Sequence, residues 1–111
     1  MEDIEIVHKN DIGIAFFWKG SFNKLQLVFK DLGLYLTYQD LKLFSKAVRE
    51  TEKQYACKDC NNQACKAFLL RTPSDKIDIA LTQAEFKQVK ALIRGALFKV
   101  ELKLYLENSK N

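Results

Sequence analysis

Two short stretches of the chain place apolar, polar and acidic residues in the same order. Residues 34–41 and 79–86 each run from apolar positions into a threonine, with an acidic residue three positions later. A threonine hydroxyl can accept a hydrogen bond from the amide three residues on, and the acidic side chain can accept from the threonine amide. We therefore expect a strand to end and a capped helix to begin at Thr37 and again at Thr82.

Short runs of β-branched, aromatic or alternating apolar residues, bounded by turn residues, predict the extended segments. The run at 12–18 shows no polar alternation, which is typical of a strand buried on both faces. Residues 24–29 alternate well enough for a half-buried strand. The expected strands are residues 4–8, 12–18, 24–29, 34–36, 67–71 and 77–81.

Apolar residues spaced by three and four positions predict a helix after each threonine. The inward positions are Leu41, Phe44 and Val48 in the first helix, and Phe86, Val89 and Ile93 in the second. The first helix should fade near Glu52.

The C-terminal segment fits two interpretations. Residues 98–106 alternate between apolar and polar positions, as in a strand, but they also continue the helical spacing of the residues before them. Gly95 either caps the end of the helix or lies inside it at a cost of about 1 kcal/mol. We favour one long helix from Thr82 to about Glu107, because no second turn residue separates a helix from a strand.

Together these elements predict an α+β fold in which one antiparallel sheet carries two helices on one face. We expect a single domain over residues 1–111, built from two similar strand–turn–strand–helix units at about 24–53 and 66–107. Internal duplication and convergence on a common strand-to-helix junction both account for the likeness of the two units.

A helix that reaches residue 107 would extend beyond a domain of this size, which should be about 30 Å across. Its C-terminal half would be apolar on two sides, which is costly in water. A second copy packed across a two-fold axis would cover this surface, so we expect a homodimer. The predicted interface residues are Leu97, Phe98, Val100, Leu102, Leu104 and Leu106.

Composition narrows the function classes without naming one. With 111 residues, 48% of them hydrophobic, the chain can bury a core without disulfides or metal. The net charge of +4 is spread without a run of like charges, so nucleic-acid binding is not indicated. The longest apolar run, residues 14–18, is far too short to cross a bilayer, and the start of the chain does not resemble a signal peptide. We expect a soluble, cytoplasmic protein that does not enter a membrane.

Three clustered cysteines form the one motif in the sequence that could bind a metal or carry out thiol chemistry. Cys57, Cys60 and Cys65 have C-x2-C-x4-C spacing, and the first pair could chelate zinc. His8, the only histidine, could supply a fourth ligand. An odd number of cysteines does not match a secreted disulfide framework. Free thiols, a reversible disulfide between the first two cysteines and a buried Cys65 are the alternatives, and no cofactor is required.

No catalytic constellation is present, since the sequence lacks a nucleophile elbow and a glycine-rich phosphate loop. We therefore favour a non-enzyme. Lys87, Lys90 and Arg94 form a basic line on one helix face that could follow phosphates, although a solvated helix face explains it more simply.

Residues 24–29 leading to Leu36 and Thr37, and residues 68–73 leading to the second capped helix, resemble a family of small, functionally uncharacterised bacterial domains. The resemblance covers most of the chain but implies neither an activity nor catalytic residues. Members of that family carry a C-x2-C pair just before the segment that matches 24–29, where this chain has no cysteine.

Three hypotheses follow from the sequence. The first is a non-enzymatic interaction or scaffolding module that homodimerises through its C-terminal helix. The second is a metal- or thiol-dependent protein that uses the cysteine cluster. The third is a weak nucleic-acid binder that uses the basic line.

Overall fold

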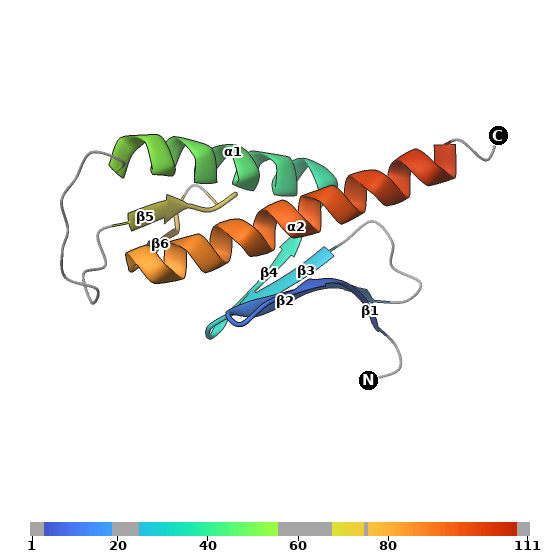
Figure 1. Ribbon diagram of the computed structural model, residues 1–111, viewed down its shortest axis with the longest axis horizontal. Coiled ribbons are helices and arrows are strands. Elements are labelled where there is room, and N and C mark those ends of the chain that lie inside the picture. Colours follow the sequence, from blue (N-terminus) through green and yellow to red (C-terminus); the bar gives the residue numbers. More distant parts are fainter. Residues whose placement is uncertain (1–3, 19–24, 56–67, 75, 109–111) are drawn as a thin grey trace.

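The structure, a computed structural model of the chain, describes residues 4–18, 25–55, 68–74 and 76–108. These residues form an α+β fold with a long C-terminal helix, as predicted, and the longest dimension of the molecule is 50 Å (Figure 1). In chain order the elements are β1 (Ile4–Lys9), β2 (Gly13–Trp18), β3 (Leu25–Phe29), β4 (Leu32–Leu36), α1 (Tyr38–Tyr55), β5 (Phe68–Arg71), β6 (Asp78–Leu81) and α2 (Gln83–Asn108).

The described strands form two sheets, so the prediction of a single sheet is wrong, whereas both helices lie on the same side of the four-stranded sheet (Figure 1). The first sheet is an antiparallel meander in the order β1-β2-β3-β4, and β5 and β6 form a separate antiparallel hairpin. The hairpin lies against the helices: β5 contacts α1, and Phe68 stacks on Phe86 of α2 with ring centroids 4.8 Å apart. The helices therefore provide the apolar surface that buries the hairpin, in place of the edge of the first sheet.

Helix α2 lies between α1 and the four-stranded sheet, where it contacts β1 and β2 (Figure 1). All six predicted inward positions of the two helices are buried, which confirms the helical spacing read from the sequence. The largest fully buried side chains are Phe29, Phe44, Leu27, Leu41, Leu70, Leu81, Leu92, Ile93, Val48 and Val89.

Strand β2 is covered on both faces only along its middle. Ala15, Phe16 and Phe17 are consecutive and all buried, as predicted for such a strand. Trp18 ends the strand 43% exposed, and its Nε1 donates a 2.8 Å hydrogen bond to Oε1 of Gln26 on β3. The outer face of this sheet is therefore open at the end of β2.

Both predicted capping boxes are present. Thr37 Oγ1 accepts from the Asp40 amide at 3.1 Å, and Asp40 Oδ2 accepts from the Thr37 amide at 3.1 Å. Thr82 Oγ1 accepts from the Glu85 amide at 3.1 Å, and Glu85 Oε1 accepts from the Thr82 amide at 2.9 Å. Each hairpin thus leads into a helix at the threonine predicted, whereas internal duplication and a single domain remain predictions.

Replacing Thr82 by alanine should destabilise the fold by about 1 kcal/mol, because the Glu85 amide then loses its side-chain acceptor. The midpoint of urea unfolding should fall at an unchanged slope. Thr82→Ser keeps the hydroxyl and should lie close to the wild type. If the serine variant lost as much stability as the alanine variant, the capping bond would not be the cause.

Candidate functional site

The C-terminal part of α2 presents a row of large apolar side chains to solvent. Phe98, Leu102, Tyr105 and Leu106 are 64%, 43%, 68% and 50% exposed. Their spacing places them on one side of the helix, and we call these four residues the outer stripe. A contiguous exposed apolar surface on a regular element is typical of an interaction site.

The other row of the predicted interface packs within the chain. Val100 is 6% exposed, and Leu97 and Leu104 are partly buried against the core. Val100 and Leu104 face the first turn of α1 and the end of β2, which reach this far along α2. Of the six predicted interface residues, Phe98, Leu102 and Leu106 therefore remain exposed.

An apolar cavity of about 90 Å³ lies beneath this part of α2. Its lining contains two hydroxyl groups: Thr37 Oγ1 accepts from the Asp40 amide, and the Tyr38 hydroxyl donates to Glu101. The lining residues are Phe17, Leu25, Leu36, Thr37, Tyr38, Leu41, Val100 and Leu104.

A hydrogen bond between the two helices closes one side of this region. The Tyr38 hydroxyl of α1 donates to Glu101 Oε2 of α2 at 2.7 Å. This bond raises the pKa of Tyr38 above its ordinary value, with further contributions from burial and from the negative charge of Glu101. The bond also holds the carboxylate of Glu101 beside the outer stripe.

Two ion pairs fix α2 against its neighbours. Lys90 pairs with Glu52 of α1, and Lys103 pairs with Glu5 of β1. The ammonium of Lys103 also lies 5.6 Å from the ring centroid of Phe17. Lys103 lies within the part of α2 that carries the outer stripe, so its ion pair ties this part of the helix to β1.

The three residues of the basic line predicted on α2 do not all face solvent. Lys87 and Arg94 are exposed, whereas Lys90 turns to α1 and pairs with Glu52. An ammonium group already paired with a carboxylate contributes less to phosphate binding. The arrangement gives the nucleic-acid hypothesis no added support.

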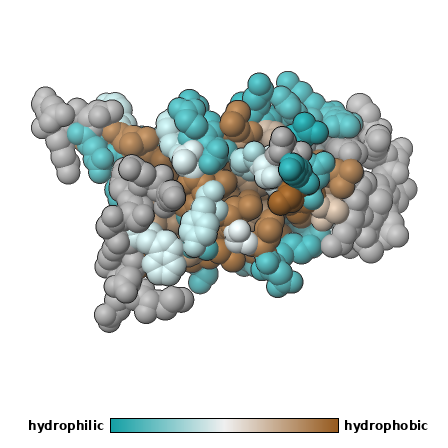
Figure 2. Space-filling view, turned by 180° about the vertical axis from the view of Figure 1, so that it is seen from behind, coloured by the Kyte–Doolittle hydropathy of each residue, from teal (hydrophilic) through white to brown (hydrophobic). Residues whose placement is uncertain are grey.

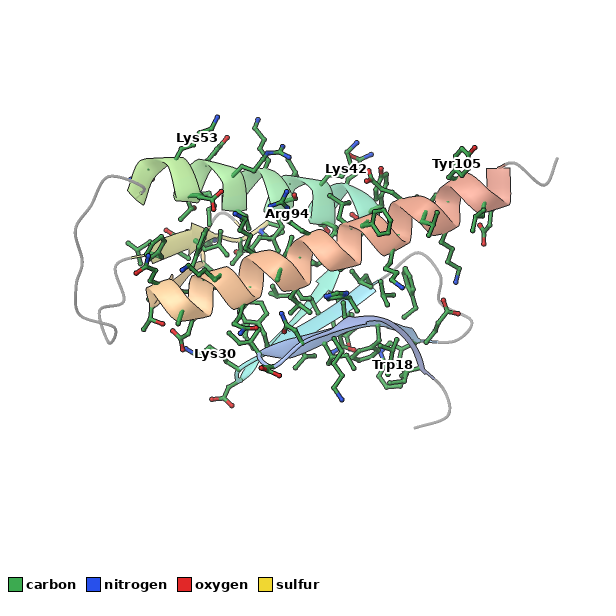
Figure 3. All side chains as sticks on the ribbon, in the orientation of Figure 1. Trp18, Lys30, Lys42, Lys53, Arg94 and Tyr105 are labelled. Carbon is green, nitrogen blue, oxygen red and sulfur yellow. The ribbon has the colours of Figure 1, made fainter. Side chains whose placement is uncertain are left out.

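Arg94 stands at the edge of the outer stripe without a carboxylate partner among the described residues (Figure 3). Glu101 follows it by about two helical turns, so the two opposite charges lie along the same flank of the stripe. The spacing of these two opposite charges is visible in the sequence, but it indicates a contact only once the outer stripe is known to face solvent. The bond of Glu101 to Tyr38 had no sequence signal, because it joins two helices.

Of the four predicted zinc ligands, the structure places only His8. Cys57, Cys60 and Cys65 lie outside the described residues. The His8 ring packs against the backbone of α2 at Gly95, where an added Cβ would lie 2.5 Å from the ring. Within residues 4–18, 25–55, 68–74 and 76–108 no three His, Cys, Asp or Glu side chains are grouped as a metal site. The zinc hypothesis stays a prediction.

Neither α1 nor α2, the helices of the described residues, combines length with enough apolar character to cross a bilayer. Comparison with known proteins adds no family: neither a protein-family model, nor a curated protein, nor a solved structure matches the chain.

Proposed function

We propose that this protein is a non-enzymatic interaction module that homodimerises through the C-terminal half of α2. The observation that carries the proposal is the outer stripe, whose four large apolar side chains are 43–68% exposed on a helix held by ion pairs on two sides. Covering them removes apolar surface from water, which favours association. In a dimer with a two-fold axis, the outer stripe of each copy covers the outer stripe of the other.

The charges beside the stripe favour an antiparallel pair of α2 helices. In a parallel pair the two-fold axis runs along the helices, so the flank that carries Arg94 and Glu101 meets the opposite flank of the second copy and these charges do not face each other. In an antiparallel pair with the two-fold axis near Phe98, Arg94 of each copy lies beside Glu101 of the other. Charge complementarity of this kind selects the orientation of paired helices.

The same axis also matches side-chain size along the helix. Phe98 lies near its own equivalent at the axis, where two aromatic rings can pack together. Tyr105 lies about two turns after Phe98, and the small, exposed Ala91 lies about two turns before it. Antiparallel pairing therefore sets the Tyr105 ring over Ala91 of the second copy, where there is room for it.

Charge reversal tests this arrangement. Arg94→Glu turns two attractive contacts into two repulsive ones, so the dimer dissociation constant should rise about tenfold, or ~1.4 kcal/mol. Glu101→Arg should have a similar effect, and the double variant should return towards the wild type because it restores both pairs with the signs exchanged. Sedimentation equilibrium over micromolar to millimolar chain concentrations measures all four proteins.

Two controls separate the dimer contact from other effects. Lys53→Glu makes the same charge change on α1, where the side chain points away from α2, and should leave dimerisation unchanged (Figure 3). Tyr38→Phe removes the internal bond to Glu101 without changing the charge. A wild-type protein that stays monomeric across the whole range, or a double variant as weak as the sum of the singles, would contradict the proposal.

A further inference from the structure

The two edges of the four-stranded sheet differ in how they are protected. β1 carries the charged residues Glu5 and Lys9, and its pairing register shifts between Ile6 and His8. Charged side chains and bulges are the usual means by which proteins keep an edge strand from pairing with another chain. β4 has none of these: its residues Leu32–Leu36 include no charge and no proline, and its register with β3 is continuous.

The free backbone groups of β4 belong to two residues. Phe29 and Leu32 pair across a two-residue turn, and such a closing pair is hydrogen-bonded. The alternation of an antiparallel ladder then directs the N–H and C=O groups of Gly33 and Tyr35 away from β3. Among the described residues, no backbone hydrogen bond from a turn, loop or cap reaches either of them.

Two copies of β4 can pair with each other so that their outward backbone groups and their side chains match. If two β4 strands run antiparallel with Leu34 at the two-fold axis, Gly33 of each copy lies opposite Tyr35 of the other. Each such pair exchanges two backbone hydrogen bonds, so the contact contains four. The same register sets Leu32 opposite Leu36 of the second copy, on the apolar side of the sheet that faces the core.

Side chains at these positions fit the same register. The Tyr35 side chain is 65% exposed. A Cβ added to Gly33 would lie 3.7 Å from Gln26 and 3.8 Å from Val28, both ordinary contact distances, so no neighbouring atom crowds this glycine. An aromatic ring laid across a strand glycine of a neighbouring strand shields its backbone from water, and the pairing places Tyr35 there in both copies.

We propose that β4 pairs antiparallel with β4 of a second copy and joins the two four-stranded sheets into one. This contact is separate from the α2 contact, because α2 contacts β1 and β2, whereas β4 is the opposite edge of the sheet. The rear face of the molecule has an apolar centre (Figure 2). With both contacts made, the protein forms assemblies larger than a dimer. The pairings of Tyr35 with Gly33 and of Leu32 with Leu36 favour a second copy as the occupant of this edge.

Tyr35→Lys adds a charge to the edge and removes the ring, and Tyr35→Phe is its matched control because it keeps the ring. Sedimentation of the full chain should show that Tyr35→Lys reduces the largest species to a dimer, whereas Tyr35→Phe leaves the largest species unchanged. A urea midpoint close to that of the wild type would show that the lysine variant is folded. An unchanged mass in the lysine variant would overturn the inference.

Amide exchange provides a second readout that does not depend on a variant. The amides of Gly33 and Tyr35 should exchange slowly at high chain concentration and speed up on dilution, while the Leu34 amide stays protected by β3. Fast exchange at every concentration, or protection only after addition of an unrelated strand-forming peptide, would exclude a second copy as the occupant. Combination with Arg94→Glu separates this inference from the proposed function, because Tyr35→Lys should remove the strand contact, whereas Arg94→Glu should weaken only the α2 contact by about tenfold. The double variant should show both effects.

Discussion

Replacing Gly13 by alanine is expected to destabilise the protein by about 3 kcal/mol, the upper end of the cost of forcing an extra carbon into a packed site. A Cβ at this position would lie 2.2 Å from the carbonyl oxygen of Val28 and 2.7 Å from the Cβ of Phe29. These atoms belong to or stand directly on the backbone of β3, so no rotamer change can move them aside. The strands must separate at this pair, where Gly13 lies opposite Phe29.

Gly33 is the matched control, because it lies in the same sheet but is not crowded by its neighbours. Its added Cβ would meet Gln26 and Val28 at ordinary contact distances of 3.7 and 3.8 Å. Gly33→Ala should therefore change stability by less than about 1 kcal/mol, and a small gain is expected from the stiffer unfolded chain. Urea unfolding of dilute protein measures both variants. If both lost the same stability, the loss would reflect glycine in a strand in general rather than the close approach of β2 and β3.

The parts of the fold that the sequence predicts best depend on residues close together in the chain. Thr82 and Glu85 stand three positions apart, so the capping bonds between them follow from the local pattern alone. The continuous helix from Gln83 to Asn108 was one of two interpretations. The structure decides for the helix because Val100 and Leu104 on one side of it line the region beneath α1.

Contacts between distant segments account for what the sequence did not predict. A strand pattern indicates that residues 68–71 will pair, but not whether their apolar face will meet another strand or a helix. Phe68 stacks on Phe86 and so attaches the second hairpin to α2. No spacing of residues along the chain predicts this contact. For the candidate site, the spacing predicted the apolar residues of α2 but not which row stays exposed, since that depends on where α1 begins.

The contact between His8 and Gly95 predicts an unusual outcome for a helix glycine. Alanine normally stabilises a helix interior by about 1 kcal/mol relative to glycine. At position 95 the added Cβ would lie 2.5–2.6 Å from three atoms of the His8 ring. Gly95→Ala should therefore destabilise the protein by about 2 kcal/mol, because the ring must leave its place between β1 and α2.

A double-mutant cycle isolates this effect. In a His8→Ala background the obstruction is gone, so Gly95→Ala should stabilise the protein by about 1 kcal/mol, as in an ordinary helix. The two substitutions should thus be coupled by about 3 kcal/mol, measured from urea unfolding of the wild type, both single variants and the double variant. A stabilising Gly95→Ala in both backgrounds would show that the imidazole does not occupy this position. The measured coupling therefore reports directly on whether the one histidine of the chain fixes the distance between β1 and α2, which carries the outer stripe.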